Sequence, residues 1–278
     1  MTIEESIKLA LEEDLGDGDH TSLSTIPTDH KGKARLIAKE NGIIAGVRIA
    51  KLVYKAVDPE TELNIFINDG DRIEIGDVIF EVSGKSISIL SAERLALNFM
   101  QRMSGIATQT RQYISIIDGT KTKLLDTRKT TPLMRLLEKE AVALGGGTNH
   151  RMGLYDMIMI KDNHVDFAGG ICKAVDACHK YLREKNKDLK IVIEIRNLKE
   201  LQTVIDHGGV DRVLLDNFTP KGIEKALLML NGKYESEASG GIDKNTIRAY
   251  AETGVDYISV GALTHQIKSL DLSLQAIA

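Results

Sequence analysis

Most of the side chains that could hold a small anion lie in three short segments of this chain. The segments, each with its cations, are residues 126–132 (Arg128 and Lys129), residues 145–151 (His150 and Arg151) and residues 160–164 (Lys161). An arginine fork binds a carboxylate through two parallel hydrogen bonds, whereas lysine acts as a movable point charge. Because the whole chain is acidic, with a formal net charge of -4, these cations are a local feature. They predict a pocket for a small, multiply charged anion such as a dicarboxylate.

A plainer interpretation of the same cations stays open. Single charged residues mostly lie at the surface. These cations could therefore form ordinary ion pairs with Glu138, Glu140 or Asp156.

Two carboxylates follow apolar runs that read as neighbouring strands. Glu194 comes after Ile191–Ile193, and Asp216 comes after Val213–Leu215. A carboxylate in such a place is costly to bury unless it meets a cation or a metal ion. Oxygen ligands suit Mg²⁺ that arrives with a phosphate substrate. The alternative is a pair of internal salt bridges to Lys161 or Arg196, since buried charges are usually paired.

Glycine-rich turns follow the last two predicted strands. Ser239, Gly240 and Gly241 precede a helix expected over residues 244–253, with Asp243 as its cap, and Gly261 follows the final strand. Free backbone amides with a helix N-terminus behind them can seat a phosphate, and barrels commonly carry that seat after their last strands. The earlier run Gly145–Gly147 is read either as a helix stop or as a mobile substrate loop.

Short strands alternate with helices in the part of the chain that carries these residues. The predicted strands are Lys123–Asp126, Met157–Lys161, Ile191–Ile195, Val213–Asp216, Ser236–Ser239 and Tyr257–Val260, and clear helices are Leu198–His207 and Pro220–Leu230. This alternation predicts parallel β/α units. Polar residues end every strand, which favours a barrel, where all those ends meet at one mouth, over an open doubly wound sheet.

The first part of the chain has a different pattern. An acidic amphipathic helix is followed by strand-like runs and by helices near residues 47–57 and 91–117; the runs are Lys33–Ala38, Gly42–Ala45, Leu63–Ile67 and Val78–Val82. Tight turns at 69–71 and 76–77 separate some of the runs. We therefore predict a small α+β domain with a largely antiparallel sheet.

Composition excludes several classes of protein. The chain has 278 residues, 42% of them hydrophobic and 27% charged, as expected for a globular protein. It lacks a basic stripe for nucleic acid, an apolar stretch long enough to span a bilayer and the pattern of a signal peptide. Its two cysteines, Cys172 and Cys178, fit neither a redox pair nor a zinc site. We expect a cytoplasmic protein with no nucleic-acid or membrane partner.

Nine strings of residues resemble the quinolinate phosphoribosyltransferase family. They are EDLGDGDHTS (13–22), ERLALN (93–98), SGIAT (104–108), DTRKTTP (126–132), GGGTNHR (145–151), IKDNH (160–164), LLDN (214–217), EASGGI (237–242) and TGVDYISVGALTH (253–265). The likeness covers nearly the whole chain. It implies an N-terminal α/β sandwich domain, taken here as residues 1–105 with a linking helix, and an incomplete, six- or seven-stranded parallel α/β barrel over 106–265. A C-terminal helix over 266–278 is expected to return to the N-terminal domain.

The resemblance also implies an activity and its site. The family transfers the phosphoribosyl group of phosphoribosyl pyrophosphate (PRPP) to quinolinate with loss of CO₂, giving nicotinate mononucleotide for NAD synthesis. It works as a homodimer or a multiple of dimers, with Mg²⁺. The implied roles are as follows: Arg128, His150, Arg151 and Lys161 for the quinolinate carboxylates; Arg102 for the partner's site; Lys129 and Lys161 for the phosphates; Thr127 for substrate; Glu194 and Asp216 for the ribose and Mg²⁺; Ser239, Gly240, Gly241 and Gly261 for the 5′-phosphate. Of these, Lys129, Lys161, Glu194 and Asp216 are the implied catalytic residues.

Three positions depart from the family's usual pattern. Leu133 stands where glycine is usual, Glu140 where tyrosine is common, and Val192 where a first glutamate usually precedes Glu194 by two residues.

Other functions remain to be tested. Lys161 at a strand end could instead be the nucleophile of a Schiff-base aldolase. A related phosphoribosyltransferase could act on nicotinate or another pyridine acid, and a similar family member linked to molybdate transport is a further possibility. The turns of residues 69–77 resemble a lipoyl-type carrier, but no lysine sits at the hairpin tip.

Overall fold

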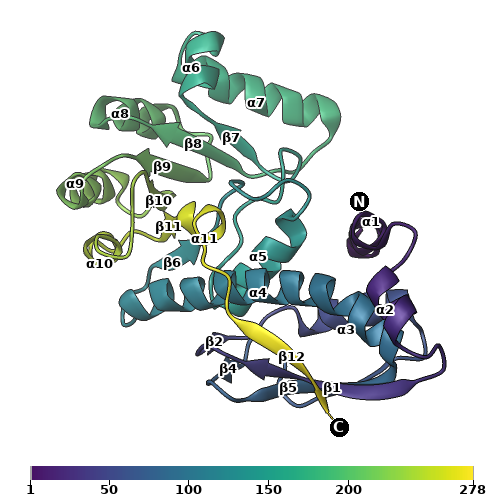
Figure 1. The fold of residues 1–278 in the computed structure, drawn as a ribbon. Helices are drawn as coiled ribbons and strands as arrows, with labels where there is room; N and C mark the ends of the chain where they lie inside the picture. The colour runs from purple at the N-terminus through teal and green to yellow at the C-terminus, as the bar shows by residue number, and fades with distance from the viewer. Residues whose placement is uncertain (1, 278) are drawn as a thin grey trace. The chain divides into compact units, whose positions relative to one another are not determined.

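The computed structural model describes residues 2–277 and divides into two compact units (Figure 1). The first unit comprises the chain up to Arg111, Thr130–Gly146 and the residues from Leu263 on. The second comprises Gln112–Lys129 and Gly147–Ala262. The sequence predicts a boundary at residue 105 instead, with the whole of 106–265 in the barrel. Residues 130–146 join the first unit because helix α5 (Arg135–Leu144) belongs there.

The first unit is an α/β sandwich. A four-stranded antiparallel sheet has the order β12-β1-β5-β3, and a two-stranded ribbon pairs β2 with β4. The strands are β1 (Lys31–Ala38), β2 (Gly42–Ile43), β3 (Glu62–Ile65), β4 (Arg72–Ile73), β5 (Val78–Lys85) and β12 (Leu272–Ile277). The helices are α1 (Ile3–Leu15), α2 (His20–Thr25), α3 (Val47–Val57), α5 and the greater part of α4 (Ser86–Ile116).

Helices α3 and α4 cover one face of the four-stranded sheet (Figure 1). Tyr54 on α3 meets Phe80 on β5 edge to face, with ring centroids 6.2 Å apart, and both are fully buried. Burial raises the pKa of the Tyr54 phenol above its usual range. Helix α5 joins the same unit through an ion pair between Arg48 and Glu140, 2.7 Å apart. Glu140, where the family commonly has tyrosine, thus has a structural role here.

The predicted C-terminal helix is wrong. The described end of the chain forms strand β12, which pairs antiparallel with β1 from Lys33–Ile277 to Ala38–Leu272. The segment Leu272–Ile277 alternates apolar and polar residues, and this period suits a strand at the edge of a sheet. The segment does return to the N-terminal unit, as a strand.

The second unit contains six parallel strands in the order β6-β11-β10-β9-β8-β7. They are β6 (Lys123–Leu125), β7 (Ile158–Ile160), β8 (Ile191–Ile195), β9 (Arg212–Asp216), β10 (Glu235–Ser239) and β11 (Tyr257–Ser259). Each strand pairs with its neighbour in the chain, except that the first, β6, pairs with the last, β11. A doubly wound sheet reverses its order near the middle, whereas this cyclic order is that of a barrel with one gap, between β6 and β7. The predicted incomplete barrel is confirmed.

Helices follow the strands and pack outside them. They are α6 (Asp162–Ala168), α7 (Ile171–Lys185), α8 (Leu198–His207), α9 (Pro220–Leu230), α10 (Ile247–Glu252) and α11 (Ala262–His265), the last reaching into the first unit. Thr219 caps α9 by accepting a hydrogen bond from Gly222 N, and Asn197 caps α8 in the same way. Because each helix packs beside the next, all strands point their carboxyl ends toward the same side.

Candidate active site

The carboxyl end of β6 is tied to the segment that carries His150. Asp126, fully buried, accepts a hydrogen bond from the His150 backbone N–H at 2.8 Å. Thr148 lies beside Leu125 as a single parallel bridge. These bonds bring Arg128, which follows β6, near Arg151 although 23 residues separate them. The first and second cationic segments therefore meet.

Arg128 and Arg151 form a pair of like charges. Burial and the charge of Arg128 lower the pKa of Arg151, and Asp156 only partly opposes them. The Asp156 carboxylate accepts from the amides of Met152 (2.7 Å) and Gly153 (2.9 Å). Among the ion pairs within residues 2–277, none includes either arginine. Two guanidinium groups within electrostatic reach of each other are an arrangement that a dicarboxylate would stabilise.

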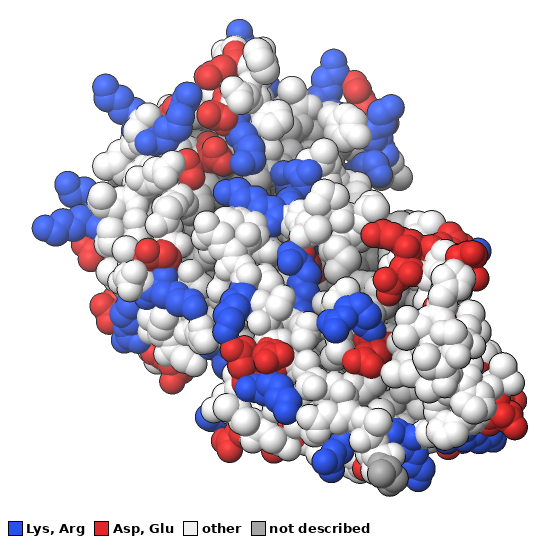
Figure 2. Space-filling model, viewed as in Figure 1, with Lys and Arg blue, Asp and Glu red and all other residues white. Residues whose placement is uncertain are grey.

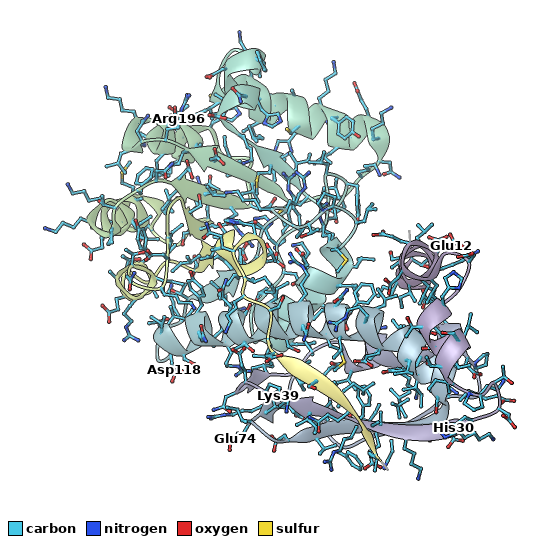
Figure 3. The ribbon with its side chains drawn as sticks, in the orientation of Figure 1. Glu12, His30, Lys39, Glu74, Asp118 and Arg196 are labelled. Atoms are coloured by element: carbon cyan, nitrogen blue, oxygen red, sulfur yellow. The ribbon has the colours of Figure 1, made fainter. Side chains whose placement is uncertain are left out.

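Lysine 161 meets one of the two strand-end carboxylates. Its Nζ lies 3.3 Å from Oε2 of Glu194, on the neighbouring strand β8. Burial is the main cause that raises the pKa of Glu194; Lys161 opposes it, and the charge of Asp216 adds to it. Glu194 and Asp216 therefore lie within electrostatic reach. The predicted alternative partner, Arg196, instead pairs with Glu200 and Asp166 on the outer side, near the start of α8 (Figure 3).

The plainer interpretation of the cations is supported for one of the three acids it named. Glu138 pairs with Arg102, and Glu140 pairs with Arg48. The charge of Asp156 acts on Arg151, although the two side chains, both among the described residues, form no ion pair. In the upper half of Figure 2, Lys and Arg side chains gather with a few acidic ones over the second unit.

Asp216 is held by two neighbours at the end of β9. Ser239 Oγ donates to it at 2.7 Å, and Asn217 Nδ2 donates at 2.6 Å. Asn217 has a positive φ of 57° and lies so close to Gly240 that a Cβ there would be 2.2 Å from its Oδ1. Only glycine fits at position 240. The chain turns sharply at Ser239–Gly241, with φ of 96° and 63° at the two glycines.

The helix expected behind this turn is present but begins later, since α10 starts at Ile247 and not at residue 244. Asp243 accepts from the amides of Asn245 (2.9 Å) and Thr246 (3.0 Å), and its carbonyl oxygen accepts from the Ile247 N–H at 2.9 Å. These are capping contacts, as expected for Asp243. The glycine turn therefore leads through one turn of chain into α10, and Gly261 lies between β11 and α11.

The other predicted residues lie as follows. Thr127 and Lys129 follow β6, and the Lys129 amide donates to Thr127 Oγ1 at 3.1 Å. His164 accepts from the Lys161 amide at 3.0 Å and so closes the first turn of α6. Gly145 ends helix α5, which supports the helix-stop interpretation of the glycine run.

Arg102 lies in the first unit and has a defined partner there. Its guanidinium binds Glu138, with Nη2 2.6 Å from Oε1, and also donates to Thr131 Oγ1 at 2.7 Å. Glu138 is fully buried, and its other oxygen accepts from the Thr131 amide at 3.2 Å. The arginine side chain is 29% exposed, so its far edge reaches solvent from a rigid base.

Sequence reasoning missed two charged residues inside the barrel. Glu237 on β10 is fully buried, 3.2 Å from His150 Nε2 and 3.0 Å from Arg212 Nη1. Glu235 and Glu237 lie at alternate positions of β10 and so on one face of the strand, which is a signal that could have found Glu237. Arg212, the first residue of β9, carries no such signal.

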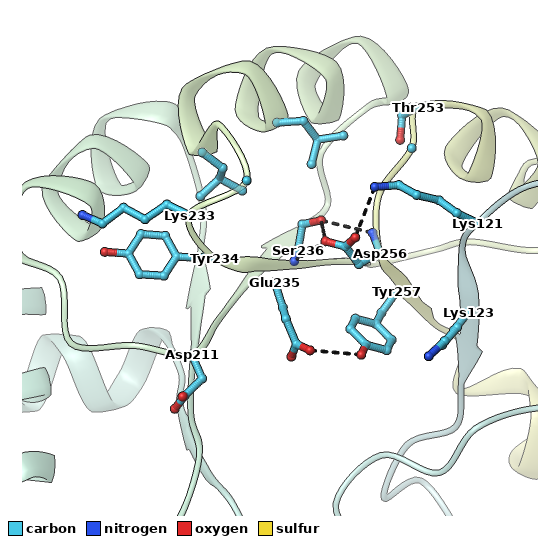
Figure 4. A pocket seen from close by; sticks show the side chains of 14 residues that line it. Lys121, Lys123, Asp211, Lys233, Tyr234, Glu235, Ser236, Thr253, Asp256 and Tyr257 are labelled. Carbon is cyan, nitrogen blue, oxygen red and sulfur yellow. Dashed lines mark hydrogen bonds and ion pairs between the residues drawn. The ribbon is translucent and has the colours of Figure 1, made fainter.

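A pocket of about 760 Å³ opens at the opposite, amino end of the strands (Figure 4). Lys121, Asp256, Glu235 and Tyr257 are among the residues that line it. Several of these residues bind one another: Lys121 pairs with Asp256 at 3.3 Å, and the Tyr257 hydroxyl donates a hydrogen bond to Glu235 at 3.1 Å. Because barrels place their chemistry at the carboxyl end, we assign the site to the cationic end and not to this pocket.

Comparison with known proteins agrees with this geometry. Residues 19–104 and 106–275 match the families described as quinolinate phosphoribosyl transferase, N-terminal domain and C-terminal domain. Within residues 2–277, none of the helices is long and apolar enough to cross a membrane.

Individual relatives match along almost the whole chain. Quinolinate phosphoribosyltransferase [decarboxylating] 1b of Nicotiana tabacum is 44% identical over 97% of this chain and 81% of its own length. A probable nicotinate-nucleotide pyrophosphorylase [carboxylating] of Bacillus subtilis is 42% identical over 94% of this chain and 89% of its own. The crystal structure of the nicotinate-nucleotide pyrophosphorylase from Francisella tularensis superposes with a TM-score of 0.93, at 42% identity, over 99% of this chain and 96% of that one. This chain therefore belongs to the quinolinate phosphoribosyltransferase family.

Proposed function

We propose that this enzyme transfers the phosphoribosyl group of PRPP to quinolinate and releases CO₂, giving nicotinate mononucleotide and pyrophosphate for NAD synthesis. One observation carries the proposal: Arg128 and Arg151 lie within electrostatic reach of each other, and neither forms an ion pair within residues 2–277, although the charge of Asp156 acts on Arg151. Quinolinate carries two carboxylates on adjacent ring carbons, so each guanidinium group can bind one of them. A ligand with a single carboxylate would leave one guanidinium group without an anion.

The chain's residues would act by position and charge. Arg128, His150 and Arg151 hold the carboxylates of quinolinate, with Lys161 beside them. Loss of pyrophosphate leaves an oxocarbenium-like carbon on the ribose, which the pyridine nitrogen attacks. The positive pyridinium nitrogen stabilises the electron pair that the departing CO₂ leaves on the adjacent ring carbon, and this carbon then takes up a proton from water. Orientation of two bound reactants is worth about 7–11 kcal/mol where it is ideal, and fixed charges add electrostatic stabilisation.

The PRPP side of the site comprises the phosphate-binding and ribose-binding groups. We assign Lys129 and Lys161 to the phosphates, Thr127 to the loop beside them, and Gly240, Gly241 and Gly261 to the 5′-phosphate. Ser239 holds Asp216 at 2.7 Å, so that the carboxylate can accept from ribose hydroxyls.

The residues fit a magnesium ion that arrives with PRPP. Within residues 2–277, no group of three or more His, Cys, Asp or Glu side chains could hold a metal by itself. Glu194 and Asp216 are two carboxylates in electrostatic contact, and Mg²⁺ is often bound by one or two carboxylates, water and substrate phosphates. When bound, the ion would neutralise charge on the leaving pyrophosphate.

The test is a reaction with PRPP, Mg²⁺ and either quinolinate or nicotinate, each labelled in the ring. We expect nicotinate mononucleotide and CO₂ from quinolinate alone. Product from nicotinate would show that the cations serve a monocarboxylate. No product from either acid would contradict the proposal and lead to a search among other pyridine acids.

The aldolase alternative has its own test. Lys161 is paired with Glu194, and in our proposal it stays a cation. Borohydride in the presence of a carbonyl substrate would trap a covalent adduct at Lys161 only if the aldolase interpretation is right.

We further propose that the enzyme is a homodimer, or a multiple of dimers, in which Arg102 reaches the partner's site. The buried Glu138 holds Arg102 at its base and leaves its outer edge exposed. Mixing Arg102→Ala protein with Arg151→Ala protein should restore part of the activity, because some sites then carry neither change. No recovery in mixed dimers, verified by mass spectrometry, would contradict shared sites.

The cytoplasmic location stays a prediction. The names of some relatives give another location: quinolinate phosphoribosyltransferase [decarboxylating] 2b of Nicotiana tabacum is named as mitochondrial, and the nicotinate-nucleotide pyrophosphorylase of Arabidopsis thaliana as chloroplastic.

A further inference from the structure

A line of buried charges runs through the barrel interior below the cationic end. The Glu237 carboxylate oxygen Oε2 lies 3.2 Å from His150 Nε2 and 3.0 Å from Arg212 Nη1. The same guanidinium donates through Nε and Nη2 to Glu235 Oε2, at 3.1 and 3.0 Å, and stacks on the Tyr257 ring at 3.9 Å from its centroid. This line connects the His150 side of the proposed site to the amino end of the strands.

The strands themselves create this arrangement. In the register of β9 and β10, Arg212 pairs with Glu235, and Glu237 follows two residues later on the same face. An arginine side chain is long enough to reach both levels. Ser239, two residues further on, reaches Asp216 at the carboxyl end. One face of β10 thus carries polar groups from one end of the barrel to the other.

Stability alone does not account for a carboxylate at position 237. Its second oxygen, Oε1, is buried and has no hydrogen-bond partner within residues 2–277. The Ser259 hydroxyl lies close enough to help lower the pKa of Glu237, but its hydrogen bond goes to the Ala238 carbonyl oxygen, at 3.5 Å. Buried ion pairs are seldom better for stability than apolar residues of the same size, and a partly satisfied one is worse. A functional reason for Glu237 is therefore worth testing.

Glu237 is ionised in this setting. Burial raises its pKa, but His150 and Arg212 more than offset that effect, and the pKa is lowered overall. His150 Nε2 faces this carboxylate at 3.2 Å. Because the ring's Nδ1 already accepts from the Arg151 N–H, Nε2 is the ring nitrogen that carries a proton toward Glu237.

His150 links this carboxylate to the arginine pair. The ring nitrogen Nδ1 of His150 accepts a hydrogen bond from the Arg151 backbone N–H at 2.6 Å, and the backbone N–H of His150 donates to the Asp126 carboxylate. The imidazole ring is thus held between Glu237 on one side and the Arg151 backbone on the other. The Arg151 guanidinium then donates to the Met157 carbonyl oxygen at 3.1 Å. Rotation of the ring would break its hydrogen bond to the Arg151 N–H and so release the backbone that carries the Arg151 side chain.

We infer that Glu237 and Arg212 are positioning residues that fix Arg151 through His150. The inference rests on the proposed function in that the ligand of Arg151 is taken to be quinolinate. Neither residue touches the substrate. Glu237 sets the orientation of the His150 ring, and Arg212 keeps Glu237 in place.

The chain offers a matched control for Glu237. Glu235 binds the same guanidinium from the other side but has no contact with His150. Glu235→Gln therefore removes one ion pair of Arg212 and leaves the path to Arg151 intact. Glu237→Gln removes an ion pair of the same arginine and breaks that path.

The first measurement is the calorimetric affinity for quinolinate. Displacing a binding group by about 1 Å can cost about 100-fold, so we expect Glu237→Gln to weaken quinolinate binding by about 10- to 100-fold, with PRPP binding unchanged. Glu235→Gln should bind both like the wild type. Equal losses in the two variants, or none in Glu237→Gln, would overturn the inference.

A double-mutant cycle tests the route through His150. If Glu237 acts through this ring, Glu237→Gln should add little further loss to His150→Ala. Additive losses would show that Glu237 acts by another path and would refute the role of His150 as the link.

A third measurement needs no substrate. The backbone amide resonance of Arg151 reports its hydrogen bond to His150, and it should shift in Glu237→Gln but not in Glu235→Gln. If wild-type protein fails to bind quinolinate and this difference persists, the proposed function fails and the positioning role stands. If the wild type binds but the resonance is the same in both variants, the positioning role fails. Should Glu237→Gln not fold, Glu237→Asp keeps the negative charge but shortens the side chain, so that the contacts of Oε2 with His150 and Arg212 both lengthen, and it must show the same pattern.

Discussion

The charged side chains at the two ends of the barrel strands differ in how they are paired. At the amino end, Lys121 faces Asp256 and Arg212 faces Glu235, so these two cations have acidic partners within the fold. At the carboxyl end, Arg128 and Arg151 lie together, and burial with mutual repulsion lowers the pKa of Arg151. The same six strands support both. Unmatched like charges destabilise a free protein and are expected where a ligand will neutralise them.

The largest expected effect tests whether the amino-end charges serve the fold. Arg212→Met leaves Glu237 buried without its arginine, and breaking a buried pair costs about 3–5 kcal/mol. Urea denaturation should show a loss of that size. Arg196→Met is the control, because its pair with Glu200 is exposed and worth about 0–1 kcal/mol. A similar loss in both variants would mean that the depth of burial does not distinguish these pairs.

The next effect concerns the carboxyl end. Arg151→Ala should weaken quinolinate binding by about 100-fold, since a charged hydrogen bond is worth about 1.5–3 kcal/mol. PRPP affinity should not change, and the fold should lose little, because the repulsion from Arg128 disappears. Calorimetry with each ligand measures both, with Lys121→Ala as the control at the other end. Unchanged quinolinate affinity would refute the assignment of Arg151.

These two arginines also mark what the sequence could and could not predict. Arg151 stands in a polar segment after a glycine run, so its role follows from local pattern. Arg212 is the first residue of β9, and a charged residue at the start of a strand is normally expected to be exposed to solvent. Only the pairing of β9 with β10 places it against Glu235 and Glu237.

Elements show the same division. Helices α3, α8 and α9 and strand β8 have the bounds that their apolar periodicity predicts. Helix α5 was missed because it buries two charged residues, Glu138 and Lys139, and so lacks a plain apolar stripe. Strand β12 was missed because its partner β1 lies more than 230 residues away in the chain.

The structural settings of Leu133 and Val192, two positions that depart from the family's pattern, follow from backbone conformation and strand register and could not be predicted from the sequence. Leu133 has a φ of 67°, a conformation that suits glycine, and its side chain is 76% exposed. Val192 is buried in β8 beside Arg212 in the register of β9. It lies two residues below Glu194, so the missing carboxylate belongs to the interior level of Arg212 and not to the strand ends.

A pH titration extends the comparison to the acids of the carboxyl end. Burial, more than Asp216, raises the pKa of Glu194 above its ordinary value of 4.5. If catalysis requires ionised Glu194, kcat/KM for PRPP should fall with acid at a midpoint above 4.5, and Glu194→Gln should lower kcat and remove this step. A folded pKa that is raised also means that Glu194 favours the fold below its unfolded pKa and loses this contribution as pH rises through the folded one. Glu194→Gln should therefore raise Tm at pH 8 relative to wild type and not at pH 4. If kcat/KM for PRPP still falls at the same acidic pH in Glu194→Gln, another group is responsible for that fall.

The smallest effect belongs to the amino-end pair of Lys121 and Asp256. The two side chains are 67% and 38% exposed, so their ion pair is worth about 0–1 kcal/mol and weakens in salt. Removing Lys121 leaves Asp256 satisfied, because Ser236 still donates to it through its amide at 3.0 Å and its hydroxyl at 2.6 Å. Burial raises the pKa of Asp256, but the hydrogen bonds from Ser236 and the contact with Lys121 together lower it overall. Lys121→Ala should thus change the free energy of unfolding by less than about 1 kcal/mol and leave kcat/KM for both substrates at the wild-type value. A clear loss of activity with an unchanged fold would show that the amino-end pocket takes part in the reaction, and the contrast between the two ends would then have to be abandoned.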